Sequence, residues 1–267
     1  MGEEGDVVVT FSPSKSARLF DLSQNQTGIF NSLLQRVDRV SLALYEKEGS
    51  FSSDSLSQYS FYGGMEGNIP SFLTNSALLY SKDWEKIEEE TTHFYRNEYL
   101  GLDVYSPTSG LLLFASDEYM KGYTTTYKER TLKIQPGLAD RMANGLFGFY
   151  ITSPKSMIDI GLEIPEAVLA KTLSIVLVFE ENENSEIVLN ADITMESDKL
   201  AKSLSILLKS SYISNKRRKG EPLGELAGLF TIDENRVSIQ NMLMDDQQLN
   251  DITDLFSSLT NLAAGEK

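Results

Sequence analysis

Two stretches far apart in the chain repeat one pattern of apolar and polar positions. They are Tyr59–Trp84 and Ile187–Tyr212, which align with an offset of 128 residues. Each begins with apolar residues at alternate positions, as in a strand with one face on a core. These strand positions are Tyr59, Phe61, Gly63 and Met65 in the first stretch, and Ile187, Leu189, Ala191 and Ile193 in the second.

A helical pattern follows the strand in both stretches. Apolar residues recur every three or four positions, which is typical of a helix that lies on a sheet. Asn68 or Ser197 is suited to cap the helix, and Pro70 or Asp198 suits its first turn. We therefore expect one helical stripe in each copy to face the sheet. It consists of Phe72, Leu73, Ser76, Leu79, Tyr80 and Trp84 in the first copy, and Leu200, Ala201, Leu204, Leu207, Leu208 and Tyr212 in the second.

The match extends in both directions along the chain. Strands are predicted upstream at Val40–Tyr45 and Leu173–Phe179, and earlier still each copy has a strand followed by Ser-Pro and a Lys. Downstream, Leu100–Ser116 and Ala227–Leu243 each predict a hairpin with a polar turn. A final helix follows each hairpin, clearly amphipathic only in the second copy. The sequence therefore predicts an α+β fold with an internal duplication of a β-α-β-β-α-β-β-α unit, in which mostly antiparallel sheets are covered by helices.

The predicted duplication divides the chain into two repeats. The first α+β repeat is residues 1–135, a linker is residues 136–144, and the second α+β repeat is residues 145–267. Duplicated domains tend to meet as a symmetric dimer does, so we expect a pseudo-two-fold arrangement. A groove between the repeats is the expected place for a protein partner or a small ligand. The sequence leaves the oligomeric state open.

The amino-acid composition limits which cell compartment and which classes of partner are expected. The formal net charge is −15 with a pI near 4.6, and the acidic residues are spread over both halves, which makes nucleic acid an unlikely partner. The chain has no cysteine, and no apolar run reaches the ~20 residues that span a bilayer. We favour the cell envelope or periplasm over the cytoplasm, and hypothesise a signal peptide or a lipid-anchored cysteine before Met1, as in a lipoprotein.

The sequence gives no constellation for catalysis, for a cofactor or for a metal. His93 is the only histidine and has no cysteine or second histidine as a partner, so we interpret it as a surface residue that leads into a strand. The acidic runs Glu85–Glu90 and Glu180–Glu186 lack the spacing of a calcium loop. Gly63 and Gly64 open a Gly-rich segment that we attribute to a bulge or close strand packing, not to a phosphate loop.

Two groups of residues are the candidate binding sites. One is the basic cluster within Asn215–Gly220, expected in an exposed loop after the second central helix, where it could contact an anion, a lipid headgroup or a nucleic acid, or complement the helix dipole. The other is an aromatic patch on the first copy, whose residues could equally serve the core. The candidates are Lys216, Arg217, Arg218 and Lys219 in the cluster, and Tyr62, Tyr95 and Tyr99 in the patch.

Three functional hypotheses follow. The favoured one is a noncatalytic binding or assembly protein of the cell envelope, because the duplicated frame is clear and catalytic motifs are missing. The first alternative is an enzyme of unknown substrate that uses carboxylates or a lysine. The second is a clamp-like scaffold, since sliding clamps are also acidic and built from repeated α+β units, although the order of their elements differs.

Overall fold

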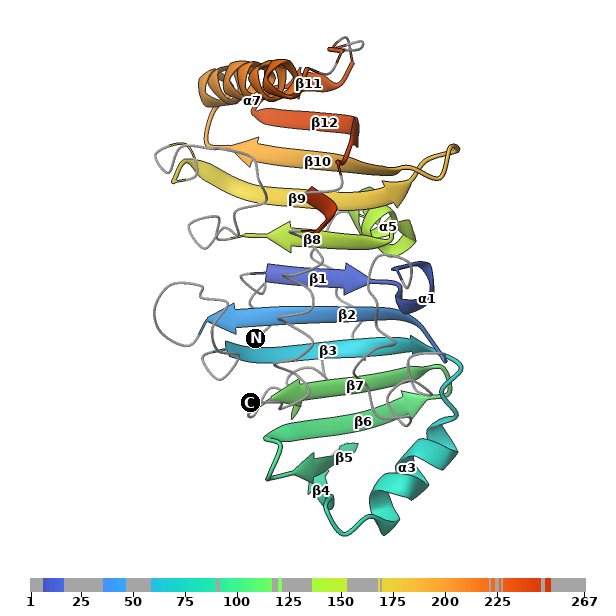
Figure 1. Ribbon diagram of the computed structural model, residues 1–267. Coiled ribbons are helices and arrows are strands. Elements are labelled where there is room, and N and C mark those ends of the chain that lie inside the picture. The colour runs from blue at the N-terminus through green and yellow to red at the C-terminus, as the bar shows by residue number, and fades with distance from the viewer. Residues whose placement is uncertain are drawn as a thin grey trace. The chain divides into compact units, whose positions relative to one another are not determined.

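The computed structural model describes residues 7–16, 36–46, 59–89, 92–116, 120–121, 136–152, 168, 170–220, 222–223, 226, 228–245 and 248–250. The chain divides into two compact units. Unit 1 comprises Met1–Gly49 and Ser57–Asn144, and unit 2 comprises Ser50–Leu56 and Gly145–Lys267. Each unit has its own run of antiparallel strands with helices against it, which is an α+β arrangement (Figure 1).

Unit 1 contains seven described strands in the order β1-β2-β3-β7-β6-β5-β4. Every neighbouring pair within this order is antiparallel. The strands are β1 (Val7–Phe11), β2 (Val37–Glu46), β3 (Tyr59–Gly67), β4 (Glu85–Glu89), β5 (Thr92–Asn97), β6 (Leu102–Thr108) and β7 (Leu111–Ser116). The described helices of this unit are α1 (Pro13–Ser16), α3 (Ser71–Tyr80) and α5 (Pro136–Asn144).

Unit 2 contains five described strands in the order β8-β9-β10-β12-β11, again with antiparallel neighbours. They are β8 (Phe147–Ile151), β9 (Thr172–Glu181), β10 (Ile187–Met195), β11 (Phe230–Asp233) and β12 (Arg236–Leu243). One long helix, α7 (Asp198–Lys219), follows β10. It begins at the N-cap Ser197, whose side chain accepts a hydrogen bond from the Leu200 amide, and it ends at Gly220 in the left-handed conformation.

The two units share a strand order. Strands β1, β2, β3, β7 and β6 of unit 1 occupy the same successive places as β8, β9, β10, β12 and β11 of unit 2. Each unit also has a helix directly after its third strand. The β4–β5 hairpin of unit 1 has no counterpart among the described strands of unit 2 and was not predicted. Residues 136–144, expected as a linker, form helix α5. The closing helix of each copy lies mostly outside the described residues.

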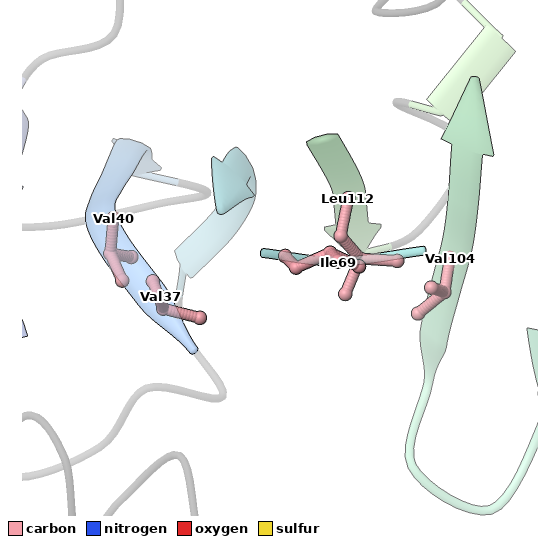
Figure 2. Packing of buried hydrophobic residues seen from close by; sticks show 5 residues of the cluster. All are labelled: Val37, Val40, Ile69, Val104 and Leu112. Carbon is pink, nitrogen blue, oxygen red and sulfur yellow. The ribbon is translucent and has the colours of Figure 1, made fainter. Parts of the chain in front are cut away.

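Both faces of the unit 1 sheet are buried. On one face, Val37 and Val40 from β2 share a cluster with Ile69, Val104 and Leu112 (Figure 2). The register of β2 against β3 shifts between Val37 and Arg39, and such a bulge lets Val37 lie on the same side as Val40. The opposite face carries a second cluster, formed by Phe94, Leu113, Ala115 and Met120.

Side chains of β1, β2 and α1 donate hydrogen bonds to the last carbonyls of helix α5. Thr10 Oγ1 and Arg39 Nη1 each donate to the carbonyl of Met142 at 3.0 Å, and Lys15 Nζ donates to the carbonyl of Asn144 at 3.1 Å. Cations complement the negative C-terminal end of a helix. Burial lowers the pKa of the Arg39 guanidinium, and the nearby carboxylate of Glu66 opposes this shift. The arrangement satisfies carbonyls that no further helical turn could satisfy.

The core of unit 2 draws on both faces of its sheet, because the consecutive β9 residues 175–179 are all buried. Phe147 of β8 and Phe179 of β9 stack with ring centroids 4.3 Å apart, and Phe149 packs edge-on against Phe179. Helix α7 contacts β10, β11 and β12, and its inner stripe is buried. That stripe consists of Ala201, Leu204, Ser205 and Leu208. The sequence prediction for the second helix is thus confirmed at Ala201, Leu204 and Leu208 and wrong at Leu207, which is 41% exposed.

Gly63 is required by close strand packing and not by a bulge. It lies in the middle of β3, paired with Leu42 of β2 and with Phe114 of β7, with no register shift beside it. A Cβ atom at this position would collide with the carbonyl oxygen of Ser41 and would lie 2.5 Å from Cζ of the Phe114 ring. The aromatic ring therefore occupies the space that a side chain would need.

We expect Gly63→Ala to lower the free energy of unfolding by about 1–3 kcal/mol, because the methyl group forces the Phe114 ring or the β2 backbone to move. Urea unfolding followed by circular dichroism measures this. Gly137→Ala is the matched control, since a Cβ there meets nothing within 4 Å and the residue lies in helix α5. The control should be neutral or slightly stabilising. Equal losses in both variants would contradict the packing argument.

A buried ion pair joins β5 to β6. Arg96 and Asp103 are direct cross-strand partners, and the guanidinium binds the carboxylate through two bonds, Nε–Oδ1 at 2.7 Å and Nη2–Oδ2 at 2.8 Å. The Asp103 side chain is 2% exposed and that of Arg96 is 35% exposed. Arg96 also lies over the Phe94 ring at 5.5 Å. The Arg96 guanidinium therefore stabilises the buried negative charge of Asp103, which would be unfavourable without a partner.

Replacing Asp103 by Asn should cost about 2–4 kcal/mol of stability, because it removes the buried carboxylate that the guanidinium binds through two bonds. Chemical denaturation at neutral pH measures the loss. The solvent-exposed pair Arg236–Asp233, at 2.8 Å, is the control, and Asp233→Asn should cost less than about 0.5 kcal/mol. Similar losses at both sites would show that burial of the pair does not matter.

Candidate binding surfaces

Helix α3 presents an apolar face to solvent. Phe72 is 78% exposed, Leu73 60%, Leu79 51% and Tyr80 84%. At 100° per residue these four side chains fall on one side of the helix, together with Ser76 and Ala77. We call this set the α3 face. Scattered exposed apolar residues are ordinary, but a contiguous group on one helix marks a contact surface.

The inner side of α3 is polar, which reverses the usual arrangement. Asn75 Nδ2 donates to the Ser106 carbonyl of β6 at 3.1 Å, and Ser71 and Ser109 hydroxyls lie 3.3 Å apart. Thr74 Oγ1 donates to the carbonyl of Pro70. Leu78 is the helix residue that packs against the cluster around Ile69. Helix α3 has no fully buried residue.

This orientation corrects the expectation that the first helical stripe faces the sheet. At the equivalent positions, Leu208 of α7 is buried whereas Tyr80 of α3 is exposed, and Ala201 is buried whereas Leu73 is exposed. The apolar period was recognised correctly, but in α3 that stripe points outward. Trp84, beyond the end of the helix, still packs on the unit 1 core.

The basic cluster lies inside helix α7 and not in a loop after it. Lys216, Arg217, Arg218 and Lys219 form the last turn before Gly220, where cations complement the helix dipole. Lys219 Nζ pairs with Asp245 Oδ2 at 2.5 Å, and Arg218 Nη2 donates to Asn215 Oδ1 at 3.1 Å. The Lys216 ammonium lies over the Tyr212 ring at 5.8 Å. Of this turn, Arg217, Arg218 and Lys219 are exposed.

The structure does not bring Tyr62, Tyr95 and Tyr99 together. Cross-strand pairing runs from Tyr62 through Ala115 and Asp103 to Arg96, and paired residues share a face of the sheet. Tyr95 is adjacent to Arg96 in β5, so it points to the opposite face. It is 3% exposed, whereas Tyr99, in the β5–β6 turn, is 96% exposed.

Tyr62 is half-buried and has a structural partner. Its hydroxyl accepts a hydrogen bond from Tyr45 at 3.0 Å, and the two rings lie 5.5 Å apart. It also packs against the cluster that contains Phe94 and Leu113. The alternative that these tyrosines serve the core therefore applies to Tyr62 and Tyr95.

His93 lies within an aromatic and charged part of the β4–β5 hairpin. It is half-buried within β5, between the rings of Tyr95 and Tyr105, with centroids 5.9 and 5.5 Å away. Its cross-strand partner is Glu88, whose carboxylate accepts from Lys86 Nζ at 2.6 Å. That hydrogen bond lowers the pKa of Glu88 and raises the pKa of Lys86. Within the described ranges, no three His, Cys, Asp or Glu side chains gather as a metal site would require.

Comparison with known proteins finds similarity in structure but not in sequence. No protein-family model matches the sequence, and no curated protein matches it. The structure is similar to that of TP0453 in crystal form III, with a TM-score of 0.62 and 13% identity over 96% of each chain. Crystal form I of the same protein gives 0.58 and 14% identity over 95% of each chain. At such identities the likeness shows a shared fold alone.

Within the part of the chain that the structure describes, no helix combines the length and the apolar character needed to cross a membrane. The longest described helix, α7, carries seven of the chain's 24 lysine and arginine residues. Helix α3, by contrast, is only ten residues long. Its exposed side chains therefore belong to a short surface helix.

We expect Tyr80→Ala and Leu208→Ala to differ sharply although the two positions are equivalent in the units. Loss of the exposed Tyr80 side chain should change the free energy of unfolding by less than about 0.5 kcal/mol. Loss of the buried Leu208 side chain should cost about 2–5 kcal/mol through the cavity that it leaves. Thermal or urea unfolding of the two single variants measures the difference. A large loss in Tyr80→Ala would show that α3 packs inward.

Proposed function

We propose that this chain is a noncatalytic binding or assembly protein built on a duplicated α+β frame, and that the α3 face is its contact surface. The observation that carries the proposal is the inverted helix. The four large apolar side chains of α3 point to solvent, while the polar side chain of Asn75 is held against β6. Burial of each side chain by a partner would contribute roughly 1.5–3 kcal/mol relative to exposure.

A comparison of helix α3 with helix α7, which follows the third strand of the other unit, supports the proposal. The two units repeat one strand order with one helix after the third strand. Helix α7 uses its apolar stripe to cover its own sheet, and α3 leaves the equivalent stripe outside. Because the apolar stripe of α3 does not cover its own sheet, its side chains are available for contact with a partner.

Two ion pairs and the histidine support a structural role for the charged and titratable groups at these places. Arg96 with Asp103, and Lys219 with Asp245, are paired with each other, and His93 lies between two tyrosine rings. We propose the exposed arginines of the last turn of α7 as a secondary contact for an anionic group. The compartment that we propose is the cell envelope, since a chain without cysteine avoids unwanted disulfides there.

A two-site variant tests the α3 face. In Phe72→Ser with Tyr80→Ser, we expect bis-ANS, a dye that fluoresces on apolar surface, to lose most of the signal that the folded wild-type chain gives. The melting temperature should stay unchanged, because both side chains are already exposed. Tyr99→Ser is the matched control, since it removes an equally exposed aromatic side chain from a turn outside α3.

The same variants can be followed in the cell. Extracts that contain the full chain should show it at a larger apparent mass than a free monomer, and the two-site variant should move to the monomer position while Tyr99→Ser does not. Unchanged dye binding by the two-site variant, together with identical migration of all three proteins, would refute the assignment of the α3 face as the contact surface.

A further inference from the structure

We infer that the partner which covers the α3 face is a second copy of this chain, bound about a two-fold axis with α3 against α3. This inference rests on the proposed function, because it names the partner of the same surface. The α3 face can be buried only by another molecule, because the helix cannot turn this face toward its own sheet. The inner side of α3 is anchored by Asn75 and by Ser71, so rotation of the helix would expose Leu78 and break the bond to Ser106.

The absence of charge on helix α3 permits a second copy at this surface. The net charge of −15 makes most contacts between two copies repulsive. Helix α3, SFLTNSALLY, has no charged residue, so contact between two α3 helices places no like charges opposite each other. Acidic and basic residues flank the helix, with Glu66 before it and Lys82, Asp83 and Glu85 after it.

The same charges disfavour an anionic lipid surface. Helices that lie on such membranes carry lysine and arginine along the polar side, where the lipid headgroups attract them. Helix α3 has none, and an overall acidic chain is repelled by anionic headgroups.

The shape of the α3 face is self-complementary. Bulky residues stand at its two ends, Phe72 and Leu73 at one and Leu79 and Tyr80 at the other, and the small residues Ser76 and Ala77 lie between them. In an antiparallel crossing centred on Ser76, the small residues of the two helices face each other at the crossing point, and the bulky end of each helix lies beside the opposite bulky end of the other. A two-fold contact needs this kind of match between a surface and itself.

The size of the surface sets the strength of the contact. Aromatic side chains bury about 150–250 Å² each, so the α3 face offers roughly 400–600 Å² on each copy. Two copies would then bury about 1,000 Å², which is at the low end for a specific interface. We therefore expect a reversible dimer that forms at roughly tens to hundreds of micromolar and strengthens as added salt screens the repulsion between two acidic chains.

A single introduced cysteine tests the crossing point, because the chain has no cysteine of its own. Small residues let helix axes approach to about 8 Å, which brings the Cα atoms at the crossing into the range of about 4.4–6.8 Å that a disulfide spans. We expect Ser76→Cys to form covalent dimers under mild oxidation. Ser203→Cys, on the exposed side of α7, is the matched control and should form at least tenfold less. Adding Tyr80→Glu to Ser76→Cys should abolish the cross-link.

Sedimentation velocity across a rising protein concentration gives a second readout on the unmodified chain. The wild type should shift from monomer toward dimer, and Tyr80→Glu should stay monomeric with an unchanged melting temperature. A monomer at every concentration, together with no more cross-linking of Ser76→Cys than of Ser203→Cys, overturns the second copy as the partner.

The bis-ANS measurement separates this failure from failure of the proposed function. If dye binding still depends on Phe72 and Tyr80 while no dimer forms, the α3 face is a contact surface for another partner. If dye binding does not depend on them, both proposals fail. Vesicles of phosphatidylcholine or phosphatidylglycerol that bind the wild type and not Tyr80→Glu would also overturn the second copy, since they would identify lipid as the partner.

Discussion

The two-sided burial of the unit 1 sheet is the constraint on which the rest of this unit depends. Because apolar clusters lie on both faces, the central strands must supply buried side chains in both directions, and the backbones must come close where space is short. Gly63 is one result, since the Phe114 ring takes the place of a side chain. The buried pair of Arg96 and Asp103 is another, since a charge on a covered face needs its partner beside it.

The same constraint explains why α3 can be inverted. Ile69, Trp84 and Leu78 already cover the β6 and β7 side chains at this end of the sheet, so the helix is not needed to supply a full apolar stripe. Its serine, threonine and asparagine side chains satisfy backbone groups of the chain around it instead. In unit 2 the corresponding helix performs the covering itself, with Ala201, Leu204 and Leu208.

Much of the fold could be predicted from alternation and turn chemistry. The hairpins at β6–β7 and β11–β12, the strands β2, β3, β9 and β10, and the buried stripe of α7 follow from local pattern. A periodic stripe does not say on which side the sheet lies, so the orientation of α3 could not be predicted. Strand β4 was missed because an edge strand needs few apolar residues, and EKIEE reads as a solvated run. Tyr95 was misassigned because its face depends on the register of β5 against β6.

Strand β4 also limits how copies of the chain can grow together. An open sheet edge offers unpaired amides and carbonyls to any other strand, and growth by that route has no natural end. Here the edge carries exposed Glu85 and the ion pair of Lys86 with Glu88, whose charges would have to lose water before another backbone could join. Such an edge resists amyloid-like stacking even in the crowded protein solution where a weak helix contact forms. A molecule of this design can associate in pairs and remain dispersed.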